Sequence, residues 1–170
     1  MYPTKYYIAL GTNVGNYKNN FSAAISELNK LGEISKLANI YKSKPYGYLH
    51  QNYFYNSVLE LQSKMMPVQL MKNIQLIEKK LQKNKRIVNG PRKIDLDIIF
   101  WGKKKFRNQN LFIPHPRAKE RDFVLLPLID LDPFFRDPET QLTIKDLLKD
   151  LKDQYVIKKL SYRNLFQKIF

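Results

Sequence analysis

Apolar and polar residues alternate along the start of the chain in a pattern typical first of a strand and then of a helix. Residues 5–10 carry the strand pattern and run into the turn-rich stretch GTNVGN. From about Asn20 the apolar residues recur at helical spacing until Gly32, at Phe21, Ala24, Ile25, Leu28 and Leu31. The pattern predicts a strand, a turn and an amphipathic helix.

Two strands, a helix and a further strand follow. Residues 34–41 and 53–61 have strand patterns and flank the polar loop KSKPYGYLHQN. Pro67 suits the first turn of a second helix, whose apolar stripe comprises Val68, Leu70, Met71, Ile74, Ile77 and Leu81. After the basic loop QKNKRIVNGP, residues 93–101 alternate as a strand.

The resulting order, β-α-β-β-α-β, is the split βαβ arrangement of ferredoxin-like folds. We therefore expect an α+β protein with an antiparallel sheet, both helices on one face, and the other face free for ligands or later segments. Beyond Gly102 the chain is less regular: a basic loop, the stretch LFIPHPRAKERDFVLLPLIDLDP, a short helix near 143–151 and a basic tail. Without repeats or a linker-like stretch, residues 1–170 are predicted to form one domain with a C-terminal addition.

Composition narrows the class of protein. With 44% hydrophobic residues the chain of 170 residues can form a packed core, and the absence of cysteine excludes disulfides and thiolate metal sites. No apolar run reaches about 18 residues, and the N-terminus lacks the pattern of a secretory signal, so we expect a cytoplasmic protein without a membrane partner. The net charge of +15 favours polyanionic partners, although it equally suits a lysine-rich, soluble surface.

The stretch NGPRKIDLDIIFWG carries the most specific chemistry. Strand alternation places Asp95 and Asp97 on one face with Ile99 and Trp101, and the carboxylates roughly 6–7 Å apart. The opposite face carries Ile94, Leu96, Ile98 and Phe100. Such a pair of aspartates could be the polar face of an edge strand. On a partly covered face, however, like charges repel unless a cation lies between them, and magnesium prefers one or two carboxylates together with phosphate oxygens.

Cationic residues stand around this pair in the sequence. Arg92 precedes the strand in a stiff Gly-Pro-Arg turn, a basic loop lies upstream, and the stretch IPHPRAKER follows with His115 and Arg121. Alone, His115 would be read as a surface histidine and Arg121 as a solvated charge. Together with the carboxylates they form the set that a metal-bound polyphosphate needs. GTNVGN, by contrast, fits neither a P-loop nor a dinucleotide fingerprint, and is interpreted as a plain turn.

Aromatic residues suggest a site for a planar ring. In NYFYNSVLEL, alternation puts Phe54 and Asn56 on one face, where a ring could stack on Phe54 and bond to Asn56. Ordinary strand core is the alternative. An RNA-recognition module would share the element order and the basic charge, but its aromatic signature is missing, and two aspartates would repel a phosphate backbone.

Four segments in order, YIALGTNVGN, FYNSVLEL, GPRKIDLDIIFWG and IPHPRAKERDFVLLPL, resemble the 6-hydroxymethyl-7,8-dihydropterin pyrophosphokinase family of folate biosynthesis, over about residues 6–133. The resemblance implies a ferredoxin-like fold and transfer of pyrophosphate from Mg-ATP to the pterin hydroxymethyl oxygen, with release of AMP. It also implies that Asp95 and Asp97 hold two Mg²⁺ ions, and that ATP and the pterin are the partners of a monomer that does not bind nucleic acid.

The resemblance also assigns roles residue by residue. The catalytic residues would be Arg92, Asp95, Asp97 and Lys83. The ATP-binding residues would be Gln75, Glu78, Lys85, Arg92, Ile98, His115 and Arg121. The pterin site would comprise Ser43, Lys44, Tyr46, Phe54, Asn56, Asn89 and Phe123, with Phe54 and Phe123 stacking on its two faces, and residues 83–89 would be a lid.

The chain departs from the family pattern at several of these positions. Asn89 stands where a tryptophan is usual, and Lys83 and Lys85 stand where arginines are usual. Lysine keeps the charge but loses the bidentate fork that matches a phosphate. Asn110 and Phe112 replace a basic and a hydroxyl residue near the nucleotide. The departures leave the predicted metal pair and Arg92 in place, and activity is expected.

Overall fold

The computed structural model describes residues 2–81 and 90–162. Within them the elements are β1 Thr4–Thr12, α1 Tyr17–Leu28, β2 Glu33–Leu37, β3 Ile40–Ser43, β4 Phe54–Ser63, α2 Pro67–Lys80, β5 Asp95–Trp101, β6 Phe106–Arg107, β7 Phe112–Ile113, a 3₁₀ turn at Ala118–Glu120, α3 Asp122–Leu131, α4 Ile144–Lys149 and β8 Val156–Leu160. None of the helices in these ranges has the length and apolar character needed to cross a bilayer.

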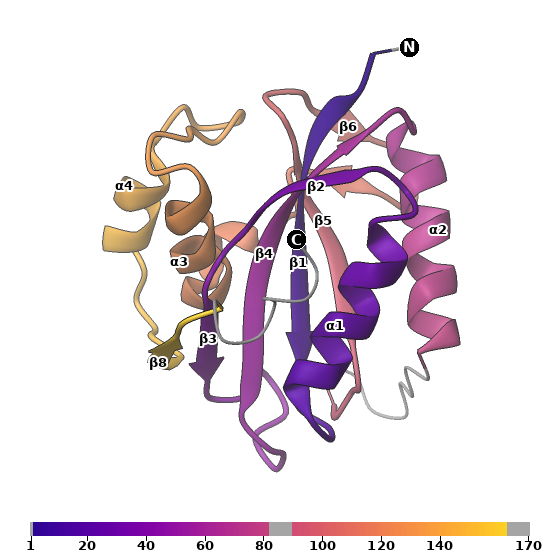
Figure 1. The fold of residues 1–170 in the computed structure, drawn as a ribbon. Coiled ribbons are helices and arrows are strands. Elements are labelled where there is room, and N and C mark those ends of the chain that lie inside the picture. The colour runs from indigo at the N-terminus through magenta and orange to yellow at the C-terminus, as the bar shows by residue number, and fades with distance from the viewer. Residues whose placement is uncertain (1, 82–89, 163–170) are drawn as a thin grey trace.

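The main sheet is antiparallel throughout. Its strands follow the order β5-β1-β4-β3-β8, and β2 also pairs with β4. Helices α1 and α2 cover one face (Figure 1), above a core that includes Tyr6, Ile8 and Leu10 of β1. The mixed α/β architecture with an antiparallel sheet and the first two helices on one face is confirmed.

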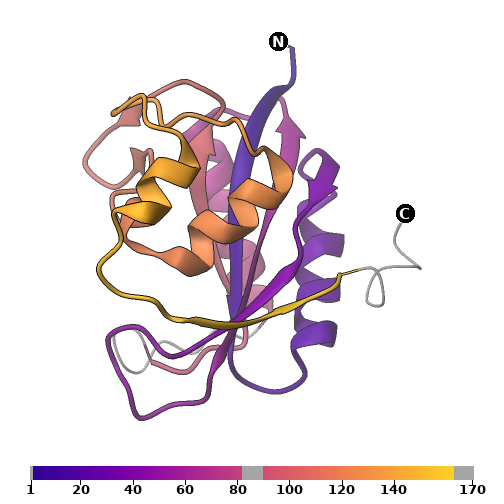
Figure 2. The same cartoon turned by 90° about the vertical axis from the view of Figure 1, so that its left-hand side faces the viewer.

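The second face of the sheet is covered in part by later segments. Helices α3 and α4 lie on this side (Figure 1, Figure 2), and their apolar residues pack with Tyr7, Val58 and Phe100 in a second core cluster. The irregular structure expected after Gly102 was wrong for residues 122–131 and 156–160, which form α3 and β8. Pro127 lies inside α3, where proline normally disfavours a helix, so the apolar run lacked a clear helical signal.

The strand expected over residues 34–41 is two strands. β2 and β3 both pair with β4, and the chain breaks between them at Ala38 and Asn39. The hydroxyl of Ser57 donates to the carbonyl oxygens of both residues, at 3.1 and 3.2 Å, so the break keeps its polar groups paired.

A β-bulge corrects the predicted faces of β5. The register with β1 shifts between Tyr7 and Ile8, which pair with Phe100 and Ile98, leaving Ile99 as the extra residue. Ile99 and Phe100 consequently both lie in the cluster beneath α3. Trp101 lies under α1 and α2, stacked on Tyr6 with ring centroids 5.9 Å apart. Trp101 was therefore wrongly placed with the aspartates and Phe100 wrongly placed opposite them, whereas Ile99 was placed correctly.

Strand β5 ends the sheet, and its outward main-chain groups are paired by other segments. The N–H of Leu96 donates to Oε1 of Glu78 on α2 at 2.8 Å, and Glu78 is 8% exposed. The N–H of His115 donates to the carbonyl oxygen of Ile99 at 2.9 Å. These contacts protect the edge from further strand pairing and fix the strand that carries the two aspartates.

We expect Glu78→Ala to lower the free energy of unfolding by about 1–3 kcal/mol, because the buried N–H of Leu96 would lose its acceptor. Urea unfolding followed by circular dichroism measures the change. Glu33→Ala, at an exposed glutamate on β2, serves as the control and should change stability by less than about 0.5 kcal/mol. Equal stability of the two variants would contradict the structural role of Glu78.

Candidate active site

A cavity opens on the second face of the sheet, next to α3. Its walls come from β1, β3, β4, β5 and the start of α3. Ten of the residues predicted from the sequence line it: Ser43, Lys44, Tyr46, Phe54, Asn56, Arg92, Asp95, Asp97, Arg121 and Phe123. Strand alternation predicted that Phe54 and Asn56 share a face of β4 and that Asp95 and Asp97 share a face of β5. All four residues line this cavity, so the two pairs lie on the same face of the sheet.

The two carboxylates of the cavity differ in their surroundings. Oδ2 of Asp95 forms an ion pair with Nε of Arg92 at 3.0 Å. For Asp97 the structure shows no hydrogen bond or ion pair within residues 2–81 and 90–162, and its side chain is half-buried. Asp97 is thus an oxygen donor that is available to a cation.

Arg92 is held in place by the GTNVGN turn. The side-chain oxygen of Asn13 accepts a hydrogen bond from the main-chain N–H of Arg92 at 2.9 Å. The main-chain N–H of Asn13 donates to the carbonyl oxygen of Arg92 at 3.1 Å. The amide nitrogen of Asn13 donates to Gln51 and Asn52 at 2.9 and 3.1 Å. The turn interpreted as a plain connection therefore positions an arginine 79 residues away. Only the asparagine-rich composition of the turn hinted at this role.

Arginine side chains lie over the aromatic rings of the cavity. The guanidinium carbon of Arg92 is 4.9 Å from the ring centroid of Phe54, and that of Arg121 is 5.1 Å from Tyr46 and 5.8 Å from Phe123. The cavity has a volume of about 50 Å³ in this conformation, enough for a few water molecules. A two-ring ligand on these aromatic faces would therefore require the guanidinium groups to move aside.

Arg121 is a cation that is partly removed from water. Burial lowers the pKa of its guanidinium, and Asp97 opposes that shift. Its Nε is buried and has no hydrogen-bond partner in the described part of the chain. A buried donor of this kind is costly to leave unpaired, so the position suits an anionic ligand.

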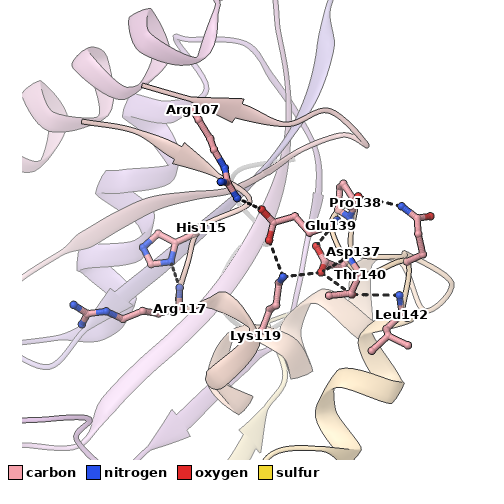
Figure 3. A network of polar contacts seen from close by, with 10 residues as sticks. Arg107, His115, Arg117, Lys119, Asp137, Pro138, Glu139, Thr140 and Leu142 are labelled. Atoms are coloured by element: carbon pink, nitrogen blue, oxygen red, sulfur yellow. Dashed lines mark hydrogen bonds and ion pairs between the residues drawn. The ribbon is translucent and has the colours of Figure 1, made fainter. Parts of the chain in front are cut away.

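His115 lies next to β5, the strand that carries the two aspartates. Its Nδ1 accepts a hydrogen bond from the main-chain N–H of Arg117 at 3.2 Å (Figure 3), so the neutral ring carries its proton on Nε2. Burial lowers the pKa of His115, although Asp97 works against the shift. The histidine is thus poised to donate from Nε2, although it is not among the residues that line the cavity.

A network of ion pairs fixes the segment between His115 and Arg121. Lys119 pairs with Asp137 at 3.0 Å and with Glu139 at 2.8 Å, and Arg107 pairs with Glu139 at 2.8 Å (Figure 3). Burial would raise the pKa of Asp137, but hydrogen bonds from Thr140 and Lys119 outweigh it and lower the pKa. The basic segment is therefore anchored at its centre to the loop before α4.

Asn56 is oriented by the neighbouring strand. Its amide nitrogen donates to Oγ of Ser43 at 2.9 Å and to the carbonyl oxygen of Tyr41 at 3.2 Å. Its carbonyl oxygen faces Gly11, where an added Cβ would lie 3.5 Å from that oxygen and 3.9 Å from Cβ of Asp95. Gly11 on β1 thus separates Asn56 on β4 from Asp95 on β5 and keeps the floor of the cavity flat.

Other predicted residues lie away from the cavity. The side chain of Ile98 is 1% exposed in the core under α1 and α2, so any nucleotide contact from Ile98 would come from its main chain. Gln75 is exposed on α2, and Glu78 of the same helix bonds to β5. Lys83, Lys85 and Asn89 lie outside the described residues, and their roles stay predictions.

The donor set is incomplete for a permanent metal ion. Within residues 2–81 and 90–162 there is no group of three or more histidine, cysteine, aspartate or glutamate side chains that could hold one. Two carboxylates on one face, beside Arg92 and Arg121, would instead need further oxygen atoms from a bound ligand. This is the arrangement that Mg²⁺ commonly adopts with substrate phosphates.

Comparisons with known proteins agree with this chemistry. The chain is 33% identical over 148 residues to 2-amino-4-hydroxy-6-hydroxymethyldihydropteridine pyrophosphokinase of Aquifex aeolicus, covering 84% of this chain and 92% of that protein. It is 42% identical over 148 residues to the folic acid synthesis protein fol1 of Pneumocystis carinii, covering 86% of this chain. It spans 20% of the length of the latter, a much longer protein.

Solved structures show the same fold. A Plasmodium falciparum HPPK-DHPS variant with pterin and p-hydroxybenzoate superposes with a TM-score of 0.72 at 17% identity, over 86% of this chain and 43% of that one. The family model of 7,8-dihydro-6-hydroxymethylpterin-pyrophosphokinase (HPPK) matches residues 7–133, which is most of the chain and includes every residue that lines the cavity. The chain is therefore a member of the 7,8-dihydro-6-hydroxymethylpterin-pyrophosphokinase family.

Proposed function

We propose that the protein transfers pyrophosphate from Mg-ATP to the hydroxymethyl oxygen of 6-hydroxymethyl-7,8-dihydropterin, giving AMP and the pterin diphosphate for folate biosynthesis. The observation that carries the proposal is one cavity in which the carboxylates of Asp95 and Asp97 face the same space as the arginines and the aromatic rings. A site for a planar heterocycle and a site for a metal-bound phosphate chain are thereby adjacent. Family membership supports the same reaction.

The aromatic half of the cavity would bind the pterin. Phe54 and Phe123 offer ring faces, and Asn56 presents a carbonyl oxygen to a donor on the edge of the heterocycle. Ser43 holds the amide of Asn56 in that orientation. Lys44 and Tyr46 complete the wall, and Asn89 is proposed to close it from the lid.

The charged half would bind the triphosphate. Arg92 and Arg121 are cations that lie over aromatic rings in this conformation, so an arriving phosphate chain offers them stronger partners. His115 can donate from Nε2, and Lys83 and Lys85 are proposed to close over the phosphates from the lid. Gln75, Glu78 and the main chain of Ile98 are proposed to line the nucleoside side.

Asp95 and Asp97 fit magnesium because both side chains are hydrogen-bond acceptors on one face of β5. Asp97, in addition, makes no hydrogen bond or ion pair with the described residues. We propose two ions. When bound, magnesium supplies positive charge that neutralises the phosphate oxygens. The aspartates of the chain would place that charge, and their mutual repulsion would then cease to be a cost.

The chain itself would orient the two reactants. The pterin oxygen forms a bond to the β-phosphorus of ATP, the bond between that phosphorus and the oxygen bridging to the α-phosphate breaks, and AMP leaves with the bridging oxygen. The hydroxyl proton would pass to a carboxylate oxygen, and Asp97 is proposed as its acceptor. Arg92 would stabilise charge on the transferring group, since its main chain is pinned by Asn13.

We propose in addition that the arrangement up to β5 is ferredoxin-like. The four strands of that fold, numbered in chain order, lie in the sheet order 4-1-3-2. The order β5-β1-β4, with β2 and β3 both outside β4, follows this pattern when β2 and β3 are counted together as the second strand. The later elements would then form a C-terminal addition within a single domain. The contacts of α3 with both β3 and β4 support this reading.

The test is an assay of AMP release from ATP and 6-hydroxymethyl-7,8-dihydropterin, with and without magnesium. We expect AMP and the pterin diphosphate in equal amounts, only when the pterin and magnesium are both present. AMP formed without pterin would indicate simple hydrolysis. No AMP from a folded protein that is saturated with both substrates would refute the proposed reaction.

A further inference from the structure

A segment beyond the family match contacts residues that line the cavity. Residues 134–162 lie outside the matched range of 7–133, and the sequence assigned no role to the tail after Asp150. Strand β8 nevertheless pairs with β3, with Val156 opposite Ser43. The last described part of the chain thus lies beside a strand that lines the cavity.

Tyr155, just before β8, completes a cluster of three aromatic rings. Its ring centroid is 5.4 Å from that of Tyr46 and 6.0 Å from that of Phe123, with interplanar angles of 65° and 86°, and the centroids of Tyr46 and Phe123 are 6.3 Å apart. Tyr46 and Phe123 line the cavity, whereas Tyr155 does not. Tyr155 therefore supports the two rings from behind.

Main-chain bonds hold Tyr155 against the same elements. The main-chain N–H of Lys44, a cavity residue, donates to the carbonyl oxygen of Tyr155 at 2.9 Å. The N–H groups of Tyr155 and Val156 both donate to Oδ2 of Asp122 at 2.8 Å. Asp122 is 3% exposed and directly precedes Phe123, so the anchor of the tail is covalently next to a ring of the cavity.

The far end of β8 is fastened to the same helix. Lys159 pairs with Asp130 of α3 at 2.8 Å, and Asp130 also accepts from the hydroxyl of Tyr41 on β3 at 3.0 Å. The strand therefore ties β3 to α3 at two points, one at each of its ends. β3 supplies Ser43, and α3 supplies Phe123, to the lining of the cavity.

We propose that Tyr155 is a positioning residue for the pterin, acting through Phe123 and Tyr46, and that β8 fixes the width of the aromatic half of the cavity. The inference rests on the proposed function, because it concerns the affinity of that site for its planar substrate. Edge-to-face contacts hold a ring at a defined tilt, which a stacking ring must keep to match a planar ligand. ATP, which would bind in the charged half, should depend on this support less than the pterin does, because its contact with the two rings would be indirect, through Arg121.

The test compares three variants of the full chain in the AMP-release assay. Tyr155→Leu keeps apolar bulk but removes the ring, and should raise KM for the pterin about tenfold, the size expected when two aromatic contacts are lost, with KM for ATP and kcat within about twofold. Tyr155→Phe keeps the ring and should restore the KM of the unsubstituted protein. Ile157→Ala, at a neighbour on β8 that is 46% exposed, is the matched control and should change nothing.

The outcomes separate this inference from the proposed function. If the unsubstituted protein releases no AMP, the proposed function fails. If it is active and Tyr155→Leu leaves KM for the pterin unchanged, or raises both KM values equally, the positioning role is refuted. Pterin affinity measured by fluorescence titration, without turnover, should weaken by the same factor as KM, and thermal unfolding shows whether Tyr155→Leu remains folded.

Discussion

Asp97→Asn should lower kcat for AMP release by about two to three decades, because the cavity would lose a negatively charged ligand for magnesium. The asparagine keeps the shape and one oxygen of the side chain. Asp97 makes no hydrogen bond or ion pair in the described part of the chain, so nothing in the fold should be broken. Stability should change by less than about 1 kcal/mol, as for a site outside a bonded network.

Steady-state AMP release at several magnesium concentrations, together with thermal unfolding, checks both halves of this expectation. The magnesium concentration for half-maximal rate should rise in Asp97→Asn. Asp153→Asn, at an exposed aspartate in the loop before β8, removes the same charge away from the cavity and should keep full activity. An active Asp97→Asn variant with an unchanged magnesium requirement would remove Asp97 from the metal site.

Strand periodicity was sufficient to predict the floor of the cavity. Alternation alone placed Phe54 with Asn56 and Asp95 with Asp97, and each pair shares a face in the structure. This works because every second side chain on a strand points the same way, whatever its neighbours are. The prediction failed beyond Ile99, at Phe100 and Trp101, because a bulge depends on the register with β1 and leaves no mark in the alternation.

Contacts between distant segments could not be predicted in the same way. Asn13 holds Arg92 across 79 residues, and Asp122 holds Tyr155 across 33. Each bond joins a polar side chain to a main-chain group, and main-chain groups have no residue signature. The sequence showed that asparagine and aspartate were present, but only the fold determines which N–H they reach.

The resemblance predicted more of the residues that line the cavity than periodicity did, but not the residues that support them. It assigned Phe123 and Tyr46 to the pterin, and the structure places both beside the cavity. It could not reach Tyr155, which lies beyond the matched segments. Residues that line the cavity can be predicted from motifs, whereas the residues that support them depend on where the chain returns to the sheet.

Arg92 combines several contacts that lysine could not reproduce. Its Nε pairs with Asp95, one terminal nitrogen donates to the carbonyl oxygen of Gly90 at 3.1 Å, and its guanidinium lies over Phe54. A planar, branched cation can keep Asp95 on one side while another nitrogen turns to a phosphate. Under the proposed function, Arg92 would link Asp95, a proposed metal ligand, to the transferring group.

Arg92→Lys should therefore lower kcat by about two to three decades, equivalent to losing one transition-state contact of about 3–4 kcal/mol, although the charge is retained. KM for ATP should change less than kcat, because the lost contact matters most when charge develops on the transferring group. Arg107→Lys is the matched control. Arg107 pairs with Glu139 on the surface, where the Arg107 side chain is 69% exposed, and this substitution should change kcat by less than about twofold. If Arg92→Lys keeps the rate of Arg107→Lys, positive charge alone is sufficient at this position. In that case the fork of Arg92 would contribute nothing to the transfer step.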